Sequence, residues 1–268
     1  MAAIQMVSSD NVDANLHTAD GLIGQAATDR AELVVLPENF PFMGAQEEDK
    51  LGIAESFGQG PVQDFLVDQS KRNGIWLIGG TVPLHASRPD RIRAASLLYS
   101  PSGECIARYD KIHLFDVSVE ENNEVYCESS TIEAGKDLVV AETPVGNIGM
   151  SVCYDLRFPE LYRSMHRQEV NIIVVPSAFT HTTGMAHWEP LLRARAIENL
   201  CYVIAPNQGG THINKRETWG HSMILNPWGD ILAELNKGDG FICADIELEP
   251  LKTLRNNFPV LKHRKINS

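Results

Sequence analysis

Three short segments of this chain occur twice, in the same order. The clearest runs from Ser96 to Ala107, where two apolar stretches flank a Pro-x-Gly turn, and it returns from Ser222 to Ala233. Repeats in the same order are typical of two structurally similar halves, which we expect to meet around residues 115–145. The two other repeated segments are 36–40, echoed at 175–179, and 75–78, echoed at 201–204.

Both halves alternate short buried strand patterns with helical patterns, which indicates an α/β fold. We expect two mixed sheets packed face to face with helices on both outer faces, in one domain that spans residues 1–268. Two independent domains are the alternative, but no Pro/Gly/Ser-rich linker separates the halves. The spacing of apolar residues predicts helices over 12–26, 61–72 and 248–255, and strands over 2–7, 33–36, 75–78 and 241–246.

Residues 116–137 show the least regular pattern, with an acidic stretch from Glu120 to Glu124. Long polar loops often form the wall or lid of an active site. The basic stretch from Lys262 to Lys265 is predicted to be a solvated terminus, with a contact to a partner subunit as the alternative.

The overall composition excludes several classes of partner. The chain has 268 residues and a formal net charge of −12, which argues against a nucleic-acid or anionic membrane surface. Its five cysteines form no C-x-x-C pair, and no apolar run is long enough for a membrane span. Together with an N-terminus that resembles a first strand, these features predict a cytoplasmic protein with reduced thiols. Motifs for zinc hydrolases, serine hydrolases and nucleotide binding are missing from the sequence.

The segment from Gly149 to Glu160 predicts a buried strand, a sharp elbow and a helix that begins near Pro159. Cys153 falls at the end of that strand, where α/β proteins present residues to a crevice. A thiol near the amides of a helix start tends to ionise and act as a nucleophile. A single cysteine is more often a small apolar core residue, so this pattern alone does not decide its role.

Two further polar residues follow apolar elements, Glu38 after one strand and Lys111 after the first hairpin. Cysteine acyl transfer requires a base, a cation or donor for the oxyanion, and a nucleophile. Spacing alone leaves the ordinary alternatives open, in which Glu38 is a solvated loop residue and Lys111 is an exposed one.

The motifs around these residues resemble those of the nitrilase superfamily, the carbon–nitrogen hydrolases, along essentially the whole chain. The resemblance implies a four-layer α-β-β-α sandwich that commonly dimerises, so a homodimer or higher homo-oligomer is expected. The motifs are Leu36–Glu38, Tyr109–Asp116 and Cys153–Glu160.

The same resemblance implies the roles of the site residues. Glu38 is the general base, Lys111 stabilises the oxyanion with the backbone N–H of Tyr154, and Cys153 attacks an amide carbonyl to form a thioester. A second glutamate is best matched by Glu128, with Glu124 and Glu133 as alternatives. No metal and no organic cofactor is required, and the partner is a small-molecule amide.

Within the superfamily, the segments after Ser177 resemble the Nit branch of amidases. That branch includes amidases of deaminated glutathione, which the sequence favours, and ω-amidases of α-ketoglutaramate. Another aliphatic amidase, a nitrilase and a catalytically silent binding module are further alternatives. The candidates for substrate binding are Arg157, Phe179, Thr180 and His187, and a distal carboxylate also has Arg193 and Arg195 as candidate partners.

Overall fold

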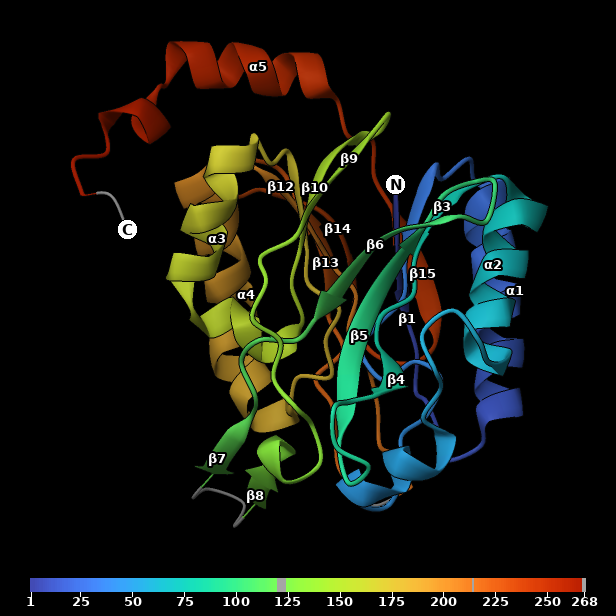
Figure 1. The fold of residues 1–268 in the computed structure, drawn as a ribbon. Helices are drawn as coiled ribbons and strands as arrows, with labels where there is room; N and C mark the ends of the chain where they lie inside the picture. Colours follow the sequence, from blue (N-terminus) through green and yellow to red (C-terminus); the bar gives the residue numbers. More distant parts are fainter. Residues whose placement is uncertain (120–123, 214, 267–268) are drawn as a thin grey trace.

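The computed structural model describes residues 1–119, 124–213 and 215–266. Its larger strands form two mixed sheets, and helices cover the outer face of each sheet (Figure 1). The layers therefore follow the order helix, sheet, sheet, helix, as the sequence predicted.

The first sheet belongs mainly to the N-terminal half and has the strand order β15-β1-β2-β3-β5-β4, with β6 also paired to β5. Strands β1, β2 and β3 run parallel, whereas β5 is antiparallel to β3 and β15 is antiparallel to β1. The bounds are β1 Ala2–Gln5, β2 Leu33–Val35, β3 Trp76–Ile78, β4 Val82–His85, β5 Ile92–Tyr99, β6 Cys105–Asp110 and β15 Gly240–Cys243.

The second sheet repeats this pattern in the order β14-β13-β12-β11-β10-β9. Strands β10, β11 and β12 run parallel, β13 and β14 continue as an antiparallel hairpin, and β9 is antiparallel to β10. This match confirms the two similar halves. The bounds are β9 Val140–Thr143, β10 Gly146–Met150, β11 Ile172–Val174, β12 Tyr202–Ala205, β13 Ser222–Leu225 and β14 Ile231–Leu235.

The repeated Pro-x-Gly phrase forms the turn of an equivalent hairpin in each sheet. Gly103 lies between β5 and β6 with φ 80°, and Gly229 lies between β13 and β14 with φ 89°. Only glycine adopts such backbone angles readily, which explains why both turns carry it at the same place.

The helices begin and end where the sequence supplies capping groups. Asn11 caps α1 by accepting a hydrogen bond from the backbone N–H of Ala14, and Gly74 ends α2 in a left-handed conformation. Helices α1 and α2 cover the first sheet, and α3 and α4 cover the second (Figure 1). The bounds are α1 Val12–Thr28, α2 Pro61–Asn73, α3 Pro159–Met165, α4 His181–Asn199 and α5 Leu248–Asn257.

Alternating strand residues supply two separate apolar cores. Ala3 and Val35 pack between the two sheets with residues such as Ile148, whereas Ile4 and Val34 pack beneath α1 and α2. This alternation follows from the two-residue repeat of a strand and holds both faces of the first sheet in place.

The structure departs from the sequence prediction in two places. Residues 116–137 contain a small antiparallel pair, β7 Asp116–Val119 and β8 Glu124–Cys127, where the acidic stretch had indicated an irregular loop. Within the acidic stretch, residues 120–123 lie outside the described residues. A 3-10 helix, Cys153–Arg157, also stands between β10 and α3, where a simple elbow was expected.

The C-terminal segment extends beyond the sandwich through α5 (Figure 1). Leu261 anchors its final 3-10 turn in the interior, while the side chains of Lys262 and Lys265 are exposed, as expected for a solvated terminus. No helix in the described part of the chain is both long and apolar enough to cross a membrane.

Candidate active site

Lys111 occupies the centre of a buried charge cluster at one end of the two sheets. It directly follows β6, and its backbone N–H donates to the carbonyl of Ala94 on β5. Its Nζ lies 2.8 Å from Oε1 of Glu38 and 2.8 Å from Oε2 of Glu128, and the side chain is shielded from solvent. Two carboxylates so close raise the pKa of Lys111 well above its ordinary value, although burial alone acts in the opposite direction. The lysine is therefore a fixed cation.

Glu38 lies in the turn after β2, and both halves of the chain hold its carboxylate. Oε1 accepts from Lys111, and Oε2 accepts from the backbone N–H of Ala178 at 2.9 Å. Burial favours the protonated acid, but the Lys111 ammonium outweighs it and keeps the pKa of Glu38 below its usual value. The side chain is therefore a carboxylate at neutral pH, ready to accept a proton.

Cys153 begins the 3-10 helix that follows β10, in a backbone conformation that residues with side chains rarely adopt. Its φ is 47°, and its N–H donates to the carbonyl of Pro176 at 2.9 Å. A thiol near a helix start tends to ionise, but burial and then the Glu38 carboxylate raise the pKa of Cys153 in this structure. The α3 helix starts only after the intervening 3-10 turn, so the amides at its start do not stabilise a thiolate on Cys153.

The buried carboxylate of Asp155 organises the elbow around Cys153. Its Oδ2 accepts from the backbone N–H of Val152 at 2.9 Å and from the Tyr109 hydroxyl at 2.7 Å. Its Oδ1 accepts from the backbone N–H of His113 at 3.0 Å. Asp155 was not among the candidate site residues. Its position two residues after Cys153, inside the Cys153–Glu160 motif, was the available signal.

Among the glutamates considered for the second acidic position, Glu128 is the one that contacts Lys111. Its carboxylate also accepts from the backbone N–H of Phe115 at 2.8 Å. Glu133 is paired instead with Arg93 of β5, and the side chain of Glu124 lies outside the described part of the structure.

A narrow pocket, called the inner pocket below, opens onto this cluster. Three of the substrate-binding candidates, Arg157, Phe179 and Thr180, line it, and so does Arg216, which was not a candidate. Arg216 is hard to find from sequence because it lies in a polar loop outside the recognised motifs. The complete lining is Glu38, Phe115, Glu128, Cys153, Tyr154, Arg157, Ala178, Phe179, Thr180, Thr183 and Arg216.

Three other candidates lie away from the inner pocket. His187 is exposed and contacts Arg157, with 3.3 Å between its Nδ1 and Nη1 of the arginine. Arg193 pairs with Glu189 along α4. Arg195 is buried and donates to the carbonyl of Leu156 through Nε and Nη2. These two arginines hold structural contacts.

The arrangement supplies the groups that acyl transfer requires. The thiol of Cys153 and the carboxylate of Glu38 line one pocket, and the Lys111 ammonium contacts that carboxylate. A thiol, a carboxylate and an ammonium are the set needed to form and stabilise a tetrahedral adduct. Within the described residues, no group of three or more His, Cys, Asp or Glu side chains is placed to hold a metal ion.

This chain is similar in sequence to known proteins over nearly its whole length. The carbon-nitrogen hydrolase family model matches residues 1–256. A deaminated glutathione amidase of Synechocystis sp. is 44% identical over 98% of this chain and 97% of its own length. One of Yersinia enterocolitica is 42% identical over 100% and 93%.

A solved structure shows that the similarity extends to the fold. Saccharomyces cerevisiae Nit3, a member of branch 10 of the nitrilase superfamily, superposes with a TM-score of 0.87 at 30% identity, over 99% of this chain and 96% of its own. By its sequence and its fold, this chain belongs to the carbon-nitrogen hydrolase family and to the Nit branch of the nitrilase superfamily.

Proposed function

We propose that this amidase hydrolyses deaminated glutathione through a thioester on Cys153. The proposed chemistry is supported by the buried contact of Lys111 with Glu38 and Glu128. Both glutamates line the inner pocket, and Cys153 is the only cysteine among its described lining residues. The substrate assignment is supported by curated relatives of that name that are 42–44% identical over nearly the whole chain.

In the proposed first half-reaction, Sγ of Cys153 attacks the amide carbon while Glu38 accepts the thiol proton. The Lys111 ammonium and the backbone N–H of Tyr154 stabilise the oxyanion. As the carbon–nitrogen bond breaks, Glu38 passes the proton to the departing amine, and a thioester remains. Because the pKa of Glu38 is low and that of the thiol is high, the proton moves only as the new bond forms.

In the second half-reaction, water attacks the thioester and Glu38 accepts its proton. Collapse of the adduct releases the carboxylic acid, and the thiol regains a proton from Glu38. Glu128 acts here as a positioning residue, because its carboxylate and the Phe115 N–H contact fix where the Lys111 ammonium lies.

The substrate assignment is tested with two amides that share one acyl group. Deaminated glutathione releases α-ketoglutarate and cysteinylglycine, and α-ketoglutaramate releases α-ketoglutarate and ammonia. The purified protein is assayed for α-ketoglutarate with each substrate, and kcat/KM is expected to be at least about tenfold higher for deaminated glutathione. Preference for α-ketoglutaramate would instead indicate an ω-amidase.

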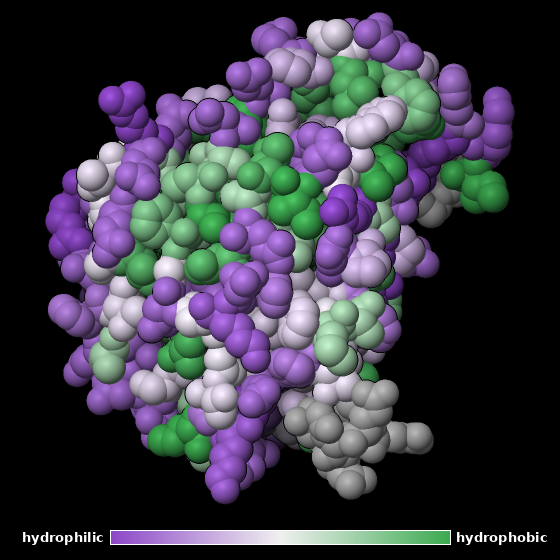
Figure 2. All heavy atoms as spheres, turned by 180° about the vertical axis from the view of Figure 1, so that it is seen from behind, coloured by the Kyte–Doolittle hydropathy of each residue, from purple (hydrophilic) through white to green (hydrophobic). Residues whose placement is uncertain are grey.

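We also propose that the chain forms a homodimer or a higher homo-oligomer. Figure 2 shows a broad apolar area on the side of the molecule turned away in Figure 1. Exposed large apolar side chains in the described chain include Trp228, Leu232 and Phe258, and the rings of Trp228 and Phe258 lie 5.6 Å apart. Large apolar areas mark interaction surfaces. Light scattering after size-exclusion chromatography tests this, and a monomer at micromolar concentration would contradict it.

A cytoplasmic location is proposed on the state of the thiols. Cys105, Cys127, Cys153, Cys201 and Cys243 are all free. Free thiols persist in a reducing compartment. Fractionation of the source cells, followed with an antibody, tests the location.

A further inference from the structure

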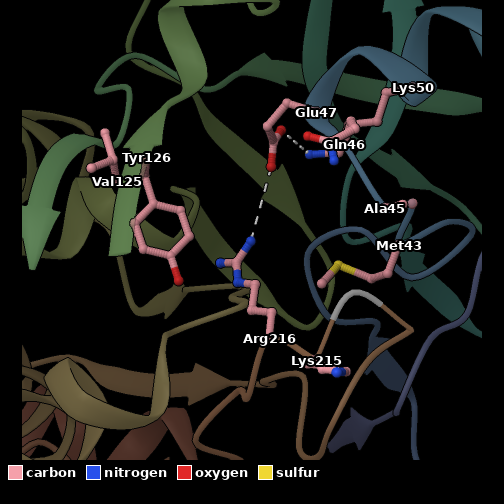
Figure 3. Close-up of a pocket in the computed structure, with 10 residues that line it drawn as sticks. Met43, Ala45, Gln46, Glu47, Lys50, Val125, Tyr126, Lys215 and Arg216 are labelled. Carbon is pink, nitrogen blue, oxygen red and sulfur yellow. Dashed lines mark hydrogen bonds and ion pairs between the residues drawn. The ribbon is translucent and has the colours of Figure 1, made fainter. Parts of the chain in front are cut away.

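A second cavity, called the outer cavity below, adjoins the inner pocket through Arg216, which lines both. Figure 3 shows the side chains of Gln46, Glu47 and Lys50 on one side, Tyr126 on the other, and Arg216 between them. The outer cavity has a volume of about 290 Å³. Its complete lining is Met43, Gly44, Ala45, Gln46, Glu47, Lys50, Val125, Tyr126, Lys215 and Arg216.

The lining of the outer cavity is positively charged, although the whole chain is acidic. Lys50, Lys215 and Arg216 face a single carboxylate, that of Glu47. Glu47 lies 2.6 Å from Nζ of Lys50 and 3.9 Å from Nη1 of Arg216, and these cations lower its pKa to about 2. The carboxylate is therefore ionised and shared between two cations.

Lys215 differs from the other two cations. Its side chain is exposed at the rim of the outer cavity, and no described carboxylate lies within ion-pair distance of it. An anion that enters the outer cavity thus meets a cation that has no acidic partner among the described residues. A ligand carboxylate is the complementary group.

We infer that the outer cavity binds the leaving half of the substrate, a short peptide amine whose terminal carboxylate pairs with Lys215. This inference rests on the proposed function. Because the nucleophile lies in the inner pocket, the acyl half occupies that pocket and the amine departs from it. Arg216 forms the shared wall, with Nη2 donating to the carbonyl of Ala178, whose N–H holds Glu38. The outer cavity therefore adjoins the place where the amine leaves.

Cysteinylglycine has the features that this cavity can recognise. Its carboxylate matches the cationic rim, and its thiol side chain suits the surfaces of Met43 and the Tyr126 ring. Ammonia, the leaving group of α-ketoglutaramate, offers none of these features. Selection between the two substrates is therefore expected to depend on the outer cavity, since their acyl halves are identical.

The first experiment compares Lys215→Ala and Lys215→Glu with wild type on both substrates. For deaminated glutathione we expect kcat/KM to fall roughly fivefold in Lys215→Ala, mainly through KM, as for loss of one exposed charge contact. A larger fall is expected in Lys215→Glu, because the new carboxylate repels the ligand. For α-ketoglutaramate both variants stay within about twofold of wild type. Lys71→Ala, an exposed lysine at the end of α2, is the matched control.

Equal losses on both substrates, or no loss on either, would overturn the inference. Inactivity of the wild-type enzyme on both substrates would contradict the proposed function instead. In that case, binding of cysteinylglycine is followed by ligand-observed NMR. Binding that disappears in Lys215→Glu and with the C-terminal amide of the dipeptide supports the outer cavity as the site. Equal NMR binding signals from cysteinylglycine and its C-terminal amide, or no binding of either, would exclude the outer cavity as the site.

Discussion

Oε1 of Glu38 lies 2.8 Å from Nζ of Lys111 at a site where both side chains are almost fully shielded from solvent. The glutamate follows β2 and the lysine follows β6, but the second oxygen of the glutamate is held by Ala178, in the other half of the chain. The contact between the two sheets is therefore also what assembles the proposed catalytic group. Replacing any member of this cluster is expected to change both the pKa values of the other members and the free energy of unfolding.

Replacing Lys111 with methionine removes the cation between two buried carboxylates. We expect the free energy of unfolding at pH 7 to fall by about 3–5 kcal/mol, because breaking a buried pair leaves uncompensated charge. In wild type the pKa of Glu38 is lowered, so its stabilising contribution is lost as the pH falls below the ordinary glutamate range. In Lys111→Met, by contrast, protonation of Glu38 or Glu128 removes the repulsion between the two carboxylates. The loss of unfolding free energy relative to wild type therefore becomes smaller as the pH falls.

Urea denaturation at pH 5 and pH 7 measures this difference, with Lys71→Met as the control for losing a lysine on the surface. A deficit of equal size at both pH values would contradict the assignment of the cluster as an ion pair.

Replacing Glu38 with glutamine is expected to separate thiol ionisation from turnover. Burial and then the Glu38 carboxylate raise the pKa of Cys153, and Lys111 opposes them. Without the carboxylate, the pKa of the thiol falls, while turnover drops at least ~100-fold through loss of the base. The measurement is the pH dependence of alkylation of the Cys153 peptide, quantified by mass spectrometry. An unchanged or higher midpoint would show that Glu38 does not act on this thiol.

Replacing Asp155 with asparagine tests the elbow that carries the nucleophile. An amide has one acceptor oxygen, so its NH₂ group must face either the Val152 N–H and Tyr109 hydroxyl or the His113 donors. We expect a loss of about 2–4 kcal/mol in unfolding free energy and a fall in kcat with little change in KM.

Tyr109→Phe is the matched control for Asp155→Asn, because it removes one donor and leaves the carboxylate. It is expected to cost about 0.5–1.5 kcal/mol. If both variants lose the same stability, the carboxylate contributes no more than its bond to the tyrosine hydroxyl.

Two arginines of neighbouring segments are predicted to differ in their effect on substrate binding. Arg157 lines the inner pocket, whereas Arg193 pairs with Glu189 and contacts the carbonyl of Gly229. Arg157→Ala should raise KM for both keto-acid substrates about 10- to 100-fold, the usual effect of losing a charged hydrogen bond. Arg193→Ala should leave KM within about twofold. Steady-state release of α-ketoglutarate measures both, and equal KM values in the two variants would exclude Arg157 as the carboxylate partner.

Most of the fold could be predicted from the sequence because its signals are local or repeated. The apolar spacing before Thr28, the Pro61 start of α2 and the two Pro-x-Gly turns each specify one element without reference to the rest of the chain. The repeats add the information that two such sets form equivalent sheets. The β7–β8 pair was missed because each strand has only four residues and the acidic stretch between them is typical of a loop.

The site could be predicted only in part. Glu38, Lys111 and Cys153 stand in recognisable motifs, and the structure brings them together, although their catalytic roles stay predictions. The pKa of Cys153 could not be inferred, because it depends on burial and on a carboxylate distant in sequence. Arg216 and Lys215 reach the cavities from a loop whose path is determined by tertiary contacts, which no local pattern encodes.

The proposed role of Cys153 as the nucleophile of an amidase can be tested by comparing three proteins. Wild type, Cys153→Ala and Cys127→Ala are assayed for α-ketoglutarate release from deaminated glutathione, since Cys127 is an exposed thiol outside the inner pocket. We expect Cys153→Ala to retain less than roughly one-thousandth of wild-type kcat, because the nucleophile is lost, and Cys127→Ala to be unchanged. Turnover by folded Cys153→Ala close to that of wild type would contradict it.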